Sequence, residues 1–188
     1  MLSRIKEYAL KNNVPIITDA GLLFLKAAII DYQIKDVLEI GTAVGYSALA
    51  MASYGCSVDT FERDEEMIHQ AQIHFDLFDD QKVIRLIPFD ALTYDQELRT
   101  YDLIFIDAAK AQYKNFFEKY TKYLKEDGIV ICDNLKFHDL KPENVNRHTR
   151  QLLRKIDTFK NYLTMHSDFN TTFFDVGDGM SISQRKIK

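Results

Sequence analysis

Cysteine is scarce in this sequence, and long apolar runs are missing from it. Only Cys56 and Cys132 occur among the 188 residues, so the chain has no paired-cysteine metal motif. Cys132 lies in an apolar run typical of a buried strand, where a thiol acts as a small hydrophobic side chain. Free cysteines fit a reducing compartment, and we predict a cytoplasmic protein. No apolar run reaches the roughly 20 residues of a membrane-spanning helix, and the N-terminus shows no signal-peptide pattern, so we expect no membrane association.

Internal repeats, low-complexity tracts and linkers are also absent. The chain is long enough to bury a proper core, and its 46% hydrophobic and 28% charged residues are ordinary for a globular protein. We therefore predict one domain spanning residues 1–188. The net charge of −4 argues weakly against a nucleic-acid partner, but residues 135–155 are locally basic. Such a patch can bind phosphates, although a solvated helix face would have the same composition.

The segment Asp36–Tyr54 organises the chain. Asp36–Ile40 is short and apolar, which is typical of a buried parallel strand. Gly41 begins a turn, and Ala48–Ala52 is a strong helix former. A strand, a glycine turn and a helix hold nucleotide-like ligands in α/β folds, because backbone N–H groups and the helix N-terminus face the ligand.

The spacing of this motif separates two kinds of ligand. A dinucleotide site would read Gly-x-Gly-x-x-Gly, whereas the pattern that begins at Glu39 is Glu-x-Gly-x-x-x-Gly. A carboxylate repels a pyrophosphate and attracts an ammonium, so the motif favours S-adenosylmethionine and argues against a nucleotide-type dehydrogenase. Glu62 follows the glycine turn by about twenty residues, where an acid can accept hydrogen bonds from ribose hydroxyls.

Strand and helix patterns alternate along the chain. We expect helices over 2–11, 18–32 and 145–165, a helix capped by Asp64 and a helix over 108–124 that Asp127-Gly128 ends. The expected strands are 36–40, 57–62, 82–87, 101–106, 129–132, 171–176 and 180–183, with Gly177-Asp178-Gly179 as the last turn. This order predicts an α/β fold: a doubly wound, mostly parallel seven-stranded sheet with a C-terminal antiparallel hairpin.

Polar side chains follow three of the later strands. Asp90-Ala91 follows the third strand, where an acid can accept from an adenine amino group, Asp107 ends the fourth, and Asp133-Asn134 ends the fifth. Adjacent strand ends would bring Asp107, Asp133 and Asn134 around one hard cation, Mg²⁺ first, with Ca²⁺ or Mn²⁺ as alternatives. Singly, each would also serve as a helix cap or a turn residue.

Lys110 lies one helical turn after Asp107. It could hold a substrate oxygen or remove its proton, because a partly buried lysine near a metal has a lowered pKa; an ordinary solvated lysine is the alternative. Tyr113, one turn further, could flank the adenine or simply pack.

Three stretches resemble one family. Val37–Met51, Phe105–Tyr113 and Ile131–Asn134 look like the metal-dependent class I O-methyltransferases, the group of the catechol and caffeoyl-CoA enzymes. The resemblance covers nearly the whole chain and implies a Rossmann-like methyltransferase fold, S-adenosylmethionine, Mg²⁺ and a homodimer. It implies catalytic roles for Asp107 and Lys110 and a metal site of Asp107, Asp133 and Asn134. The implied S-adenosylmethionine site consists of Ile17, Glu39, Gly41, Ser47, Glu62, Asp90, Ala91 and Asp107.

Within that group, the chain looks most like the bacterial tRNA 5-hydroxyuridine methyltransferases, which make 5-methoxyuridine at the wobble position. The similar stretches are 8–17, 147–163 and 166–183. This resemblance implies a tRNA anticodon loop as partner, with Phe137 or His138 stacking on a base, although a buried Phe137 fits equally. The basic residues expected to hold RNA phosphates are Lys136, Arg147, Arg150 and Arg154.

Two features depart from the family. Phe89 stands where relatives often have glycine before the Asp-Ala pair, and a further N-terminal helix that helps form the dimer or cover the acceptor is missing from this sequence. An O-methyltransferase acting on a small catechol-like or caffeoyl-CoA-like substrate is therefore an alternative. A non-catalytic S-adenosylmethionine-binding or RNA-binding protein is another, but it would have no need of the metal-type ligands.

Overall fold

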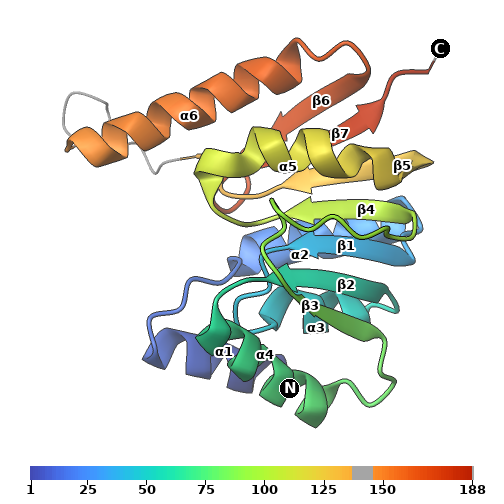
Figure 1. Cartoon of the computed structure of the whole chain (residues 1–188), viewed down its shortest axis with the longest axis vertical. Helices are drawn as coiled ribbons and strands as arrows, with labels where there is room; N and C mark the ends of the chain where they lie inside the picture. Colours follow the sequence, from blue (N-terminus) through green and yellow to red (C-terminus); the bar gives the residue numbers. More distant parts are fainter. Residues whose placement is uncertain (137–145, 188) are drawn as a thin grey trace.

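A single twisted sheet forms the centre of the molecule. The structure, a computed structural model, describes residues 1–136 and 146–187. The seven strands have the order β3-β2-β1-β4-β5-β7-β6 (Figure 1). Their bounds are Asp36–Ile40 (β1), Ser57–Glu62 (β2), Ile84–Pro88 (β3), Tyr101–Ile106 (β4), Leu124–Cys132 (β5), Phe169–Phe174 (β6) and Met180–Arg185 (β7). The first five strands are parallel, and β7 is antiparallel to both its neighbours. The predicted fold class is confirmed.

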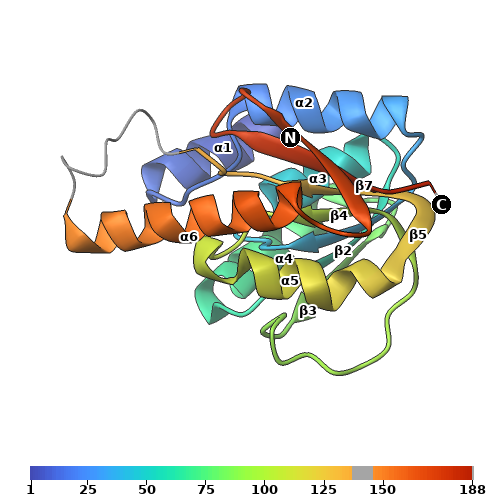
Figure 2. The same ribbon diagram turned by 90° about the horizontal axis from the view of Figure 1, so that it is seen from above.

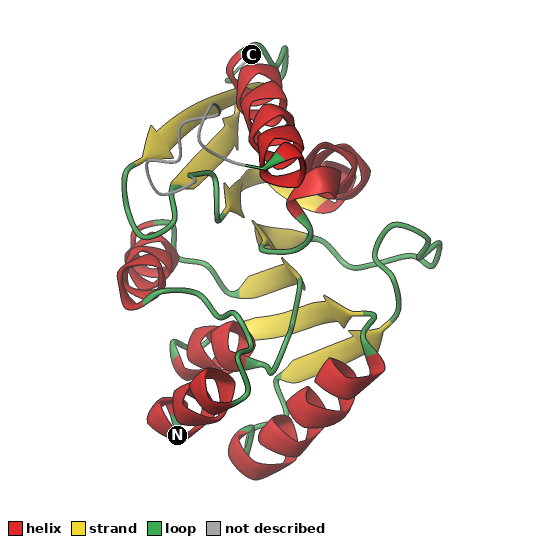
Figure 3. Ribbon diagram, turned by 90° about the vertical axis from the view of Figure 1, so that its left-hand side faces the viewer, coloured by secondary structure: helices red, strands yellow, loops and turns green. Residues whose placement is uncertain are grey.

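Helices cover both faces of this sheet, as Figure 3 shows. They are α1 (Leu2–Lys11), α2 (Asp19–Asp31), α3 (Tyr46–Ser53), α4 (Glu65–Phe78), α5 (Tyr113–Tyr120) and α6 (Arg147–Thr164), with two short 3₁₀ helices, η1 (Lys110–Gln112) and η2 (Thr121–Tyr123). Local capping explains several of the helix starts. The side chains of Thr18, Asp64 and Asn146 accept hydrogen bonds from the first-turn N–H groups of α2, α4 and α6.

Two hydrophobic cores lie on opposite faces of the sheet. Residues of α1–α4 form the first with one set of strand side chains, and α5 and α6 form the second with the other. Consecutive residues of β1 alternate between them: Val37 is in the first core and Leu38 in the second. A strand that is buried on both faces needs a mostly apolar sequence, which is why β1 and β4 are apolar apart from Asp36 and Glu39 in β1 and Asp102 in β4.

The segment 108–128 differs from its prediction. The expected helix over 108–124 is shorter at both ends, because α5 spans only Tyr113–Tyr120 after η1, and the expected strand 129–132 is longer, because β5 begins at Leu124. Asp127 and Gly128 therefore lie inside a strand and do not end a helix. The reason is pairing with a distant segment: Leu124 is opposite Tyr101 in β4, and a side chain on Gly128 would contact the Asp102 carbonyl oxygen at 3.0 Å. Bounds of the other elements shift by about one to three residues, as is usual at element ends.

No helix in the described ranges is both long enough and apolar enough to cross a membrane.

Candidate functional site

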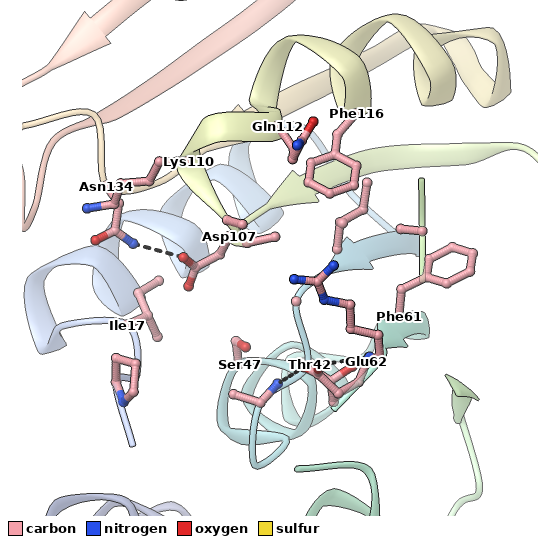
Figure 4. Close-up of a pocket in the computed structure, with 18 of the residues that line it drawn as sticks. Ile17, Thr42, Ser47, Phe61, Glu62, Asp107, Lys110, Gln112, Phe116 and Asn134 are labelled. Carbon is pink, nitrogen blue, oxygen red and sulfur yellow. Dashed lines mark hydrogen bonds between the residues drawn. The ribbon is translucent and has the colours of Figure 1, made fainter. Parts of the chain in front are cut away.

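A cavity of about 530 Å³ opens at the carboxyl ends of β1, β2 and β4. In Figure 4, Asp107, Lys110 and Asn134 lie at one end of it, and Phe61 and Glu62 lie at the other. Of the residues predicted to bind a cofactor, those that line the cavity are Ile17, Gly41, Ser47, Glu62, Asp90, Ala91 and Asp107. Ligands of open α/β sheets bind at this edge, because the strand ends and helix N-termini converge there.

The glycine turn after β1 is held from both sides. Gly41 N and Thr42 N each donate to the Phe61 carbonyl oxygen at 3.1 Å. Ala43 N donates to one carboxylate oxygen of Glu62 at 2.9 Å, and the other oxygen accepts from Arg63 N at 2.9 Å. Glu62 thus fixes the turn against the end of β2, while its carboxylate still lines the cavity.

Glu39 lies behind the cavity wall and is not part of its lining. Its side chain is 0% exposed, and it accepts hydrogen bonds from Ser47 Oγ and Thr60 Oγ1, both at 2.5 Å. Burial raises the pKa of Glu39 to about 7, against the opposing effect of these two hydroxyl donors, and the charge of Asp107 raises it further. Glu39 is therefore connected to the cavity through Ser47, which lines it.

The raised pKa of Glu39 predicts a pH-dependent stability. The folded protein holds a proton on Glu39 up to about pH 7, whereas the unfolded chain loses it near the ordinary value of 4.5. Stability is therefore lost as the pH rises between those two values. We expect Glu39→Gln to be more stable than the wild type at pH 8 by about 3 kcal/mol, a difference that shrinks below pH 5. Urea unfolding at both pH values measures it.

The exposed Glu126 provides the control for this comparison. Glu126→Gln should show the same difference from the wild type at both pH values. A Glu39→Gln difference that does not change between pH 5 and pH 8 would contradict the assignment.

A short loop after β3 forms the wall beside Glu62. Asp90 accepts from Leu92 N at 2.8 Å and from the Arg63 guanidinium at 3.0 Å, and these donors hold its pKa below the usual range. Phe89, the departure from the family pattern, also lines the cavity and is 53% exposed. It supplies an aromatic surface at the rim, where a glycine would leave open space.

The opposite end of the cavity is acidic. Asn134 Nδ2 donates to Asp107 Oδ1 at 2.8 Å, which Figure 4 marks with a dashed line. Asp133 is 3% exposed, lies behind the cavity lining and accepts from Asn134 N at 2.6 Å. Burial raises the pKa of Asp107 to about 6 and that of Asp133 to about 7, and the charge of Asp107 contributes to the rise at Asp133.

Tyr113 packs and does not reach the cavity. It is buried, and its hydroxyl donates to the Asp133 carbonyl oxygen at 3.0 Å, so it supports the acidic end from behind. Phe116, one turn further along α5, lines the cavity instead.

Lys110 lines this end of the cavity together with Asp178, which was predicted only as part of a turn. Asp178, in the loop between β6 and β7, also lines the cavity and raises the pKa values of Asp107 and Asp133. Burial lowers the pKa of Lys110, and the charge of Asp178 is the largest influence against that shift. In the sequence, the signal for Asp178 was its position between two glycines. In the structure both glycines have a positive φ, and they pack closely against Thr18 and Lys136.

The acidic end fits a hard divalent cation. No group of three His, Cys, Asp or Glu side chains that could hold a metal occurs in residues 1–136 and 146–187. The combination here is two carboxylates and one amide, all oxygen donors, and the left-handed backbone of Asn134 (φ 62°) places the amide beside Asp107. The charge of Asp107 raises the proton affinity of the buried Asp133, and a cation beside these two carboxylates would relieve that repulsion.

The predicted RNA-binding residues lie apart from the cavity lining. Lys136 forms an ion pair with Asp175. Arg147, Arg150 and Arg154 follow helical spacing on one side of α6; Arg147 and Arg154 are exposed and Arg150 is half-buried. Figure 2 shows this end of α6 extending past the sheet. Phe137 and His138 lie outside the described residues.

Comparison with known proteins agrees with this geometry. A family model described as O-methyltransferase matches residues 1–186. The O-methyltransferase ankF of Aspergillus thermomutatus is 35% identical over 55% of this chain, and the match spans about half (47%) of that relative. A crystal structure from Staphylococcus aureus, assigned as a candidate caffeoyl-CoA O-methyltransferase, is 36% identical with a TM-score of 0.93 and covers 98% of this chain and 92% of its own.

A more distant structure shares the fold. The Podospora anserina methyltransferase PaMTH1, solved with S-adenosylhomocysteine bound, is 23% identical with a TM-score of 0.86 and covers 99% of this chain and 88% of its own. Because the family model spans almost every residue, the chain belongs to the O-methyltransferase family, as an S-adenosylmethionine-dependent O-methyltransferase of the class I, caffeoyl-CoA O-methyltransferase-like group.

Proposed function

We propose that this protein is a Mg²⁺-dependent O-methyltransferase that methylates the 5-hydroxyl of wobble 5-hydroxyuridine in tRNA, giving 5-methoxyuridine. The observation that carries the metal-dependent part is the acidic end of the cavity, where Asp107 and Asn134 are hydrogen-bonded and Asp133 is buried next to them. The tRNA part rests on the arginine side of α6 and on the resemblance described above.

The cavity residues divide into binding roles. Glu62 and Asp90 provide carboxylate acceptors at one end, suited to the ribose hydroxyls and the adenine amino group of S-adenosylmethionine. Ser47, backed by the buried Glu39, lies toward the cationic amino-acid end of that ligand. Ile17 is buried and closes the cavity from the N-terminal side.

The acidic end has a separate role at the acceptor. Asp107, Asp133 and Asn134 would hold Mg²⁺, which when bound supplies a Lewis acid that lowers the pKa of the acceptor hydroxyl. Lys110 lines the same end and can hold the acceptor oxygen or take its proton. Holding the hydroxyl in line with the methyl group accounts for much of the remaining rate gain.

The position of α6 supports the nucleic-acid substrate. This helix packs against η1, which contains Lys110 and Gln112 of the cavity lining. Arg147 and Arg154 are therefore on an element that borders the acceptor end, and their exposed guanidinium groups suit phosphates. A wobble base is already unpaired, so presenting it to the cavity costs little, and its 5-hydroxyl lies beside the 4-carbonyl, so the two oxygens can chelate a cation as a catechol does.

The test compares two acceptors with labelled S-adenosylmethionine, with and without Mg²⁺: tRNA carrying 5-hydroxyuridine, and a simple catechol. We expect Mg²⁺-dependent labelling of the tRNA, and the double variant Arg147→Ala/Arg154→Ala should weaken it about tenfold or more at physiological salt. Lys35→Ala is the matched control, because Lys35 is exposed and precedes β1 at the opposite edge of the sheet.

The second candidate is methylation of a small catechol-like or caffeoyl-CoA-like substrate, which the assignment of the Staphylococcus aureus relative favours. Labelling of the catechol alone, unchanged in the arginine variant, would support this candidate and contradict the tRNA substrate. The homodimer and the cytoplasmic location stay predictions.

A further inference from the structure

Two adjacent side chains near the end of α5 donate to the backbone of the loop that follows β3. Lys119 Nζ donates to the Ala91 carbonyl oxygen at 2.9 Å and to the Leu92 carbonyl oxygen at 2.7 Å. Tyr120 Oη donates to the same Ala91 oxygen at 2.6 Å. Three hydrogen bonds from one helix thus converge on two consecutive carbonyl groups.

These carbonyl groups belong to the cavity wall. Asp90, Ala91 and Leu92 all line the cavity, in a segment that contains neither helix nor strand. Asp90 binds the backbone within this loop through its side chain and its carbonyl group, and it contacts another segment through its ion pair with the exposed Arg63 after β2. Lys119 and Tyr120 are the link from the loop to α5, which packs on β4.

Placing these two donors against the loop costs desolvation free energy, which indicates that the contact has a role. Tyr120 is 1% exposed, and desolvation lowers the pKa of the half-buried Lys119. Its direct acceptors are neutral carbonyl groups, and the charges of Asp90 and Asp95 offset only part of its desolvation. A charged donor on a carbonyl group makes a stronger hydrogen bond than a neutral one, which suits fixing a loop of irregular backbone.

We propose that Lys119 and Tyr120 are positioning residues that hold the Asp90–Leu92 loop in the shape that binds the adenosine part of S-adenosylmethionine. The inference rests on the proposed placement of the adenosine at this end of the cavity. It also accounts for how the loop keeps its shape in this chain with Phe89, in place of a glycine, at its start. Neither residue lines the cavity, so each acts through the loop.

Calorimetric titration of the purified protein with S-adenosylhomocysteine and with 5′-methylthioadenosine, which lacks the amino-acid part, tests the proposal. We expect Lys119→Met to weaken the binding of both ligands by a similar factor of about ten. Tyr120→Phe, which removes one hydroxyl, should weaken both by a smaller common factor, and Lys119→Arg should restore most of the affinity because its guanidinium can donate to both carbonyl groups. Lys122→Met is the matched control: Lys122 is exposed and its ammonium lies over the Tyr123 ring.

Two readouts separate this inference from the proposed function. If the wild type binds neither ligand, the placement of S-adenosylmethionine fails, and the inference fails with it. If the wild type binds both and Lys119→Met binds them equally well, or loses S-adenosylhomocysteine alone, the positioning role is wrong while the proposed function stands. Faster amide hydrogen exchange over residues 89–95 in Lys119→Met, absent in Lys122→Met, would support the positioning role independently of catalysis.

Discussion

Replacing Asp133 by alanine is expected to lower methyl transfer by about a thousandfold while S-adenosylmethionine binding stays within about threefold of the wild type. The two effects separate because Asp133 is not part of the cavity lining, whereas Ile17, Ser47, Glu62 and Asp90, which are proposed to bind the cofactor, are. The substitution removes the buried carboxylate of the proposed cation site, and with it a charge that would hold a divalent cation at the acceptor. Radiolabel transfer and calorimetry on the same preparation measure the two quantities.

Asp127→Ala is the matched control, since Asp127 is an exposed carboxylate on β5, the strand that Asp133 directly follows. It should leave both quantities unchanged. A methyl-transfer rate in Asp133→Ala equal to that of the wild type would contradict the proposed metal-binding role of Asp133. An equal loss of S-adenosylmethionine binding and methyl transfer would also contradict it. A non-catalytic binding protein would show no transfer in the wild type to begin with.

The second large effect is expected at the end of β1. Gly41 has φ 107°, and a Cβ built there would lie 2.0 Å from the Asp107 carbonyl oxygen. That oxygen belongs to the backbone and cannot move away freely, because Asp107 N is hydrogen-bonded to the Ile40 carbonyl oxygen at 3.0 Å. Gly41→Ala should therefore cost more than about 4 kcal/mol of unfolding free energy, from a forbidden contact added to backbone strain.

Gly55 isolates the backbone part of that cost. Its φ is 91°, but a Cβ there meets nothing within 4 Å, so Gly55→Ala should cost only about 1–2 kcal/mol. Urea unfolding of both variants gives the comparison. Equal losses of unfolding free energy at the two positions would show that the close approach of Gly41 to Asp107 is not the reason that position 41 requires glycine.

The local signals in the sequence were sufficient for most of the fold. Apolar strand patterns, the glycine turn after Ile40 and capping residues such as Thr18 and Asp64 predict elements that the structure contains. They succeed because each depends on neighbours within a few residues. The convergence of Asp107 and Asn134 was also predictable, since parallel strands end at one edge of a sheet. The metal-binding role of these residues stays a prediction.

Distant pairing was the source of the errors and omissions. The helix predicted over 108–124 was too long at its C-terminal end because Leu124 pairs with Tyr101, a contact that no local pattern records. Asp178 reached the site unnoticed because the antiparallel insertion of β7 beside β5 carries its loop back to the acidic end. Both outcomes depend on strand order, and strand order is set by contacts between residues more than twenty positions apart.

By itself the sequence determined the element types, the glycine turn and which acids lie at strand ends, because backbone conformation and side-chain periodicity are local properties. Only the tertiary structure decided that Glu39 is enclosed behind Ser47 with a pKa of about 7, and that Lys119 and Tyr120 hold the loop after β3. The physical reason is that burial and desolvation are set by every element packed around a group. From the sequence, Glu39 was predicted to contact the ligand directly. In the fold, Ser47 of α3 and Thr60 of β2 donate to its buried carboxylate, so Glu39 supports the cavity wall and its protonation affects stability.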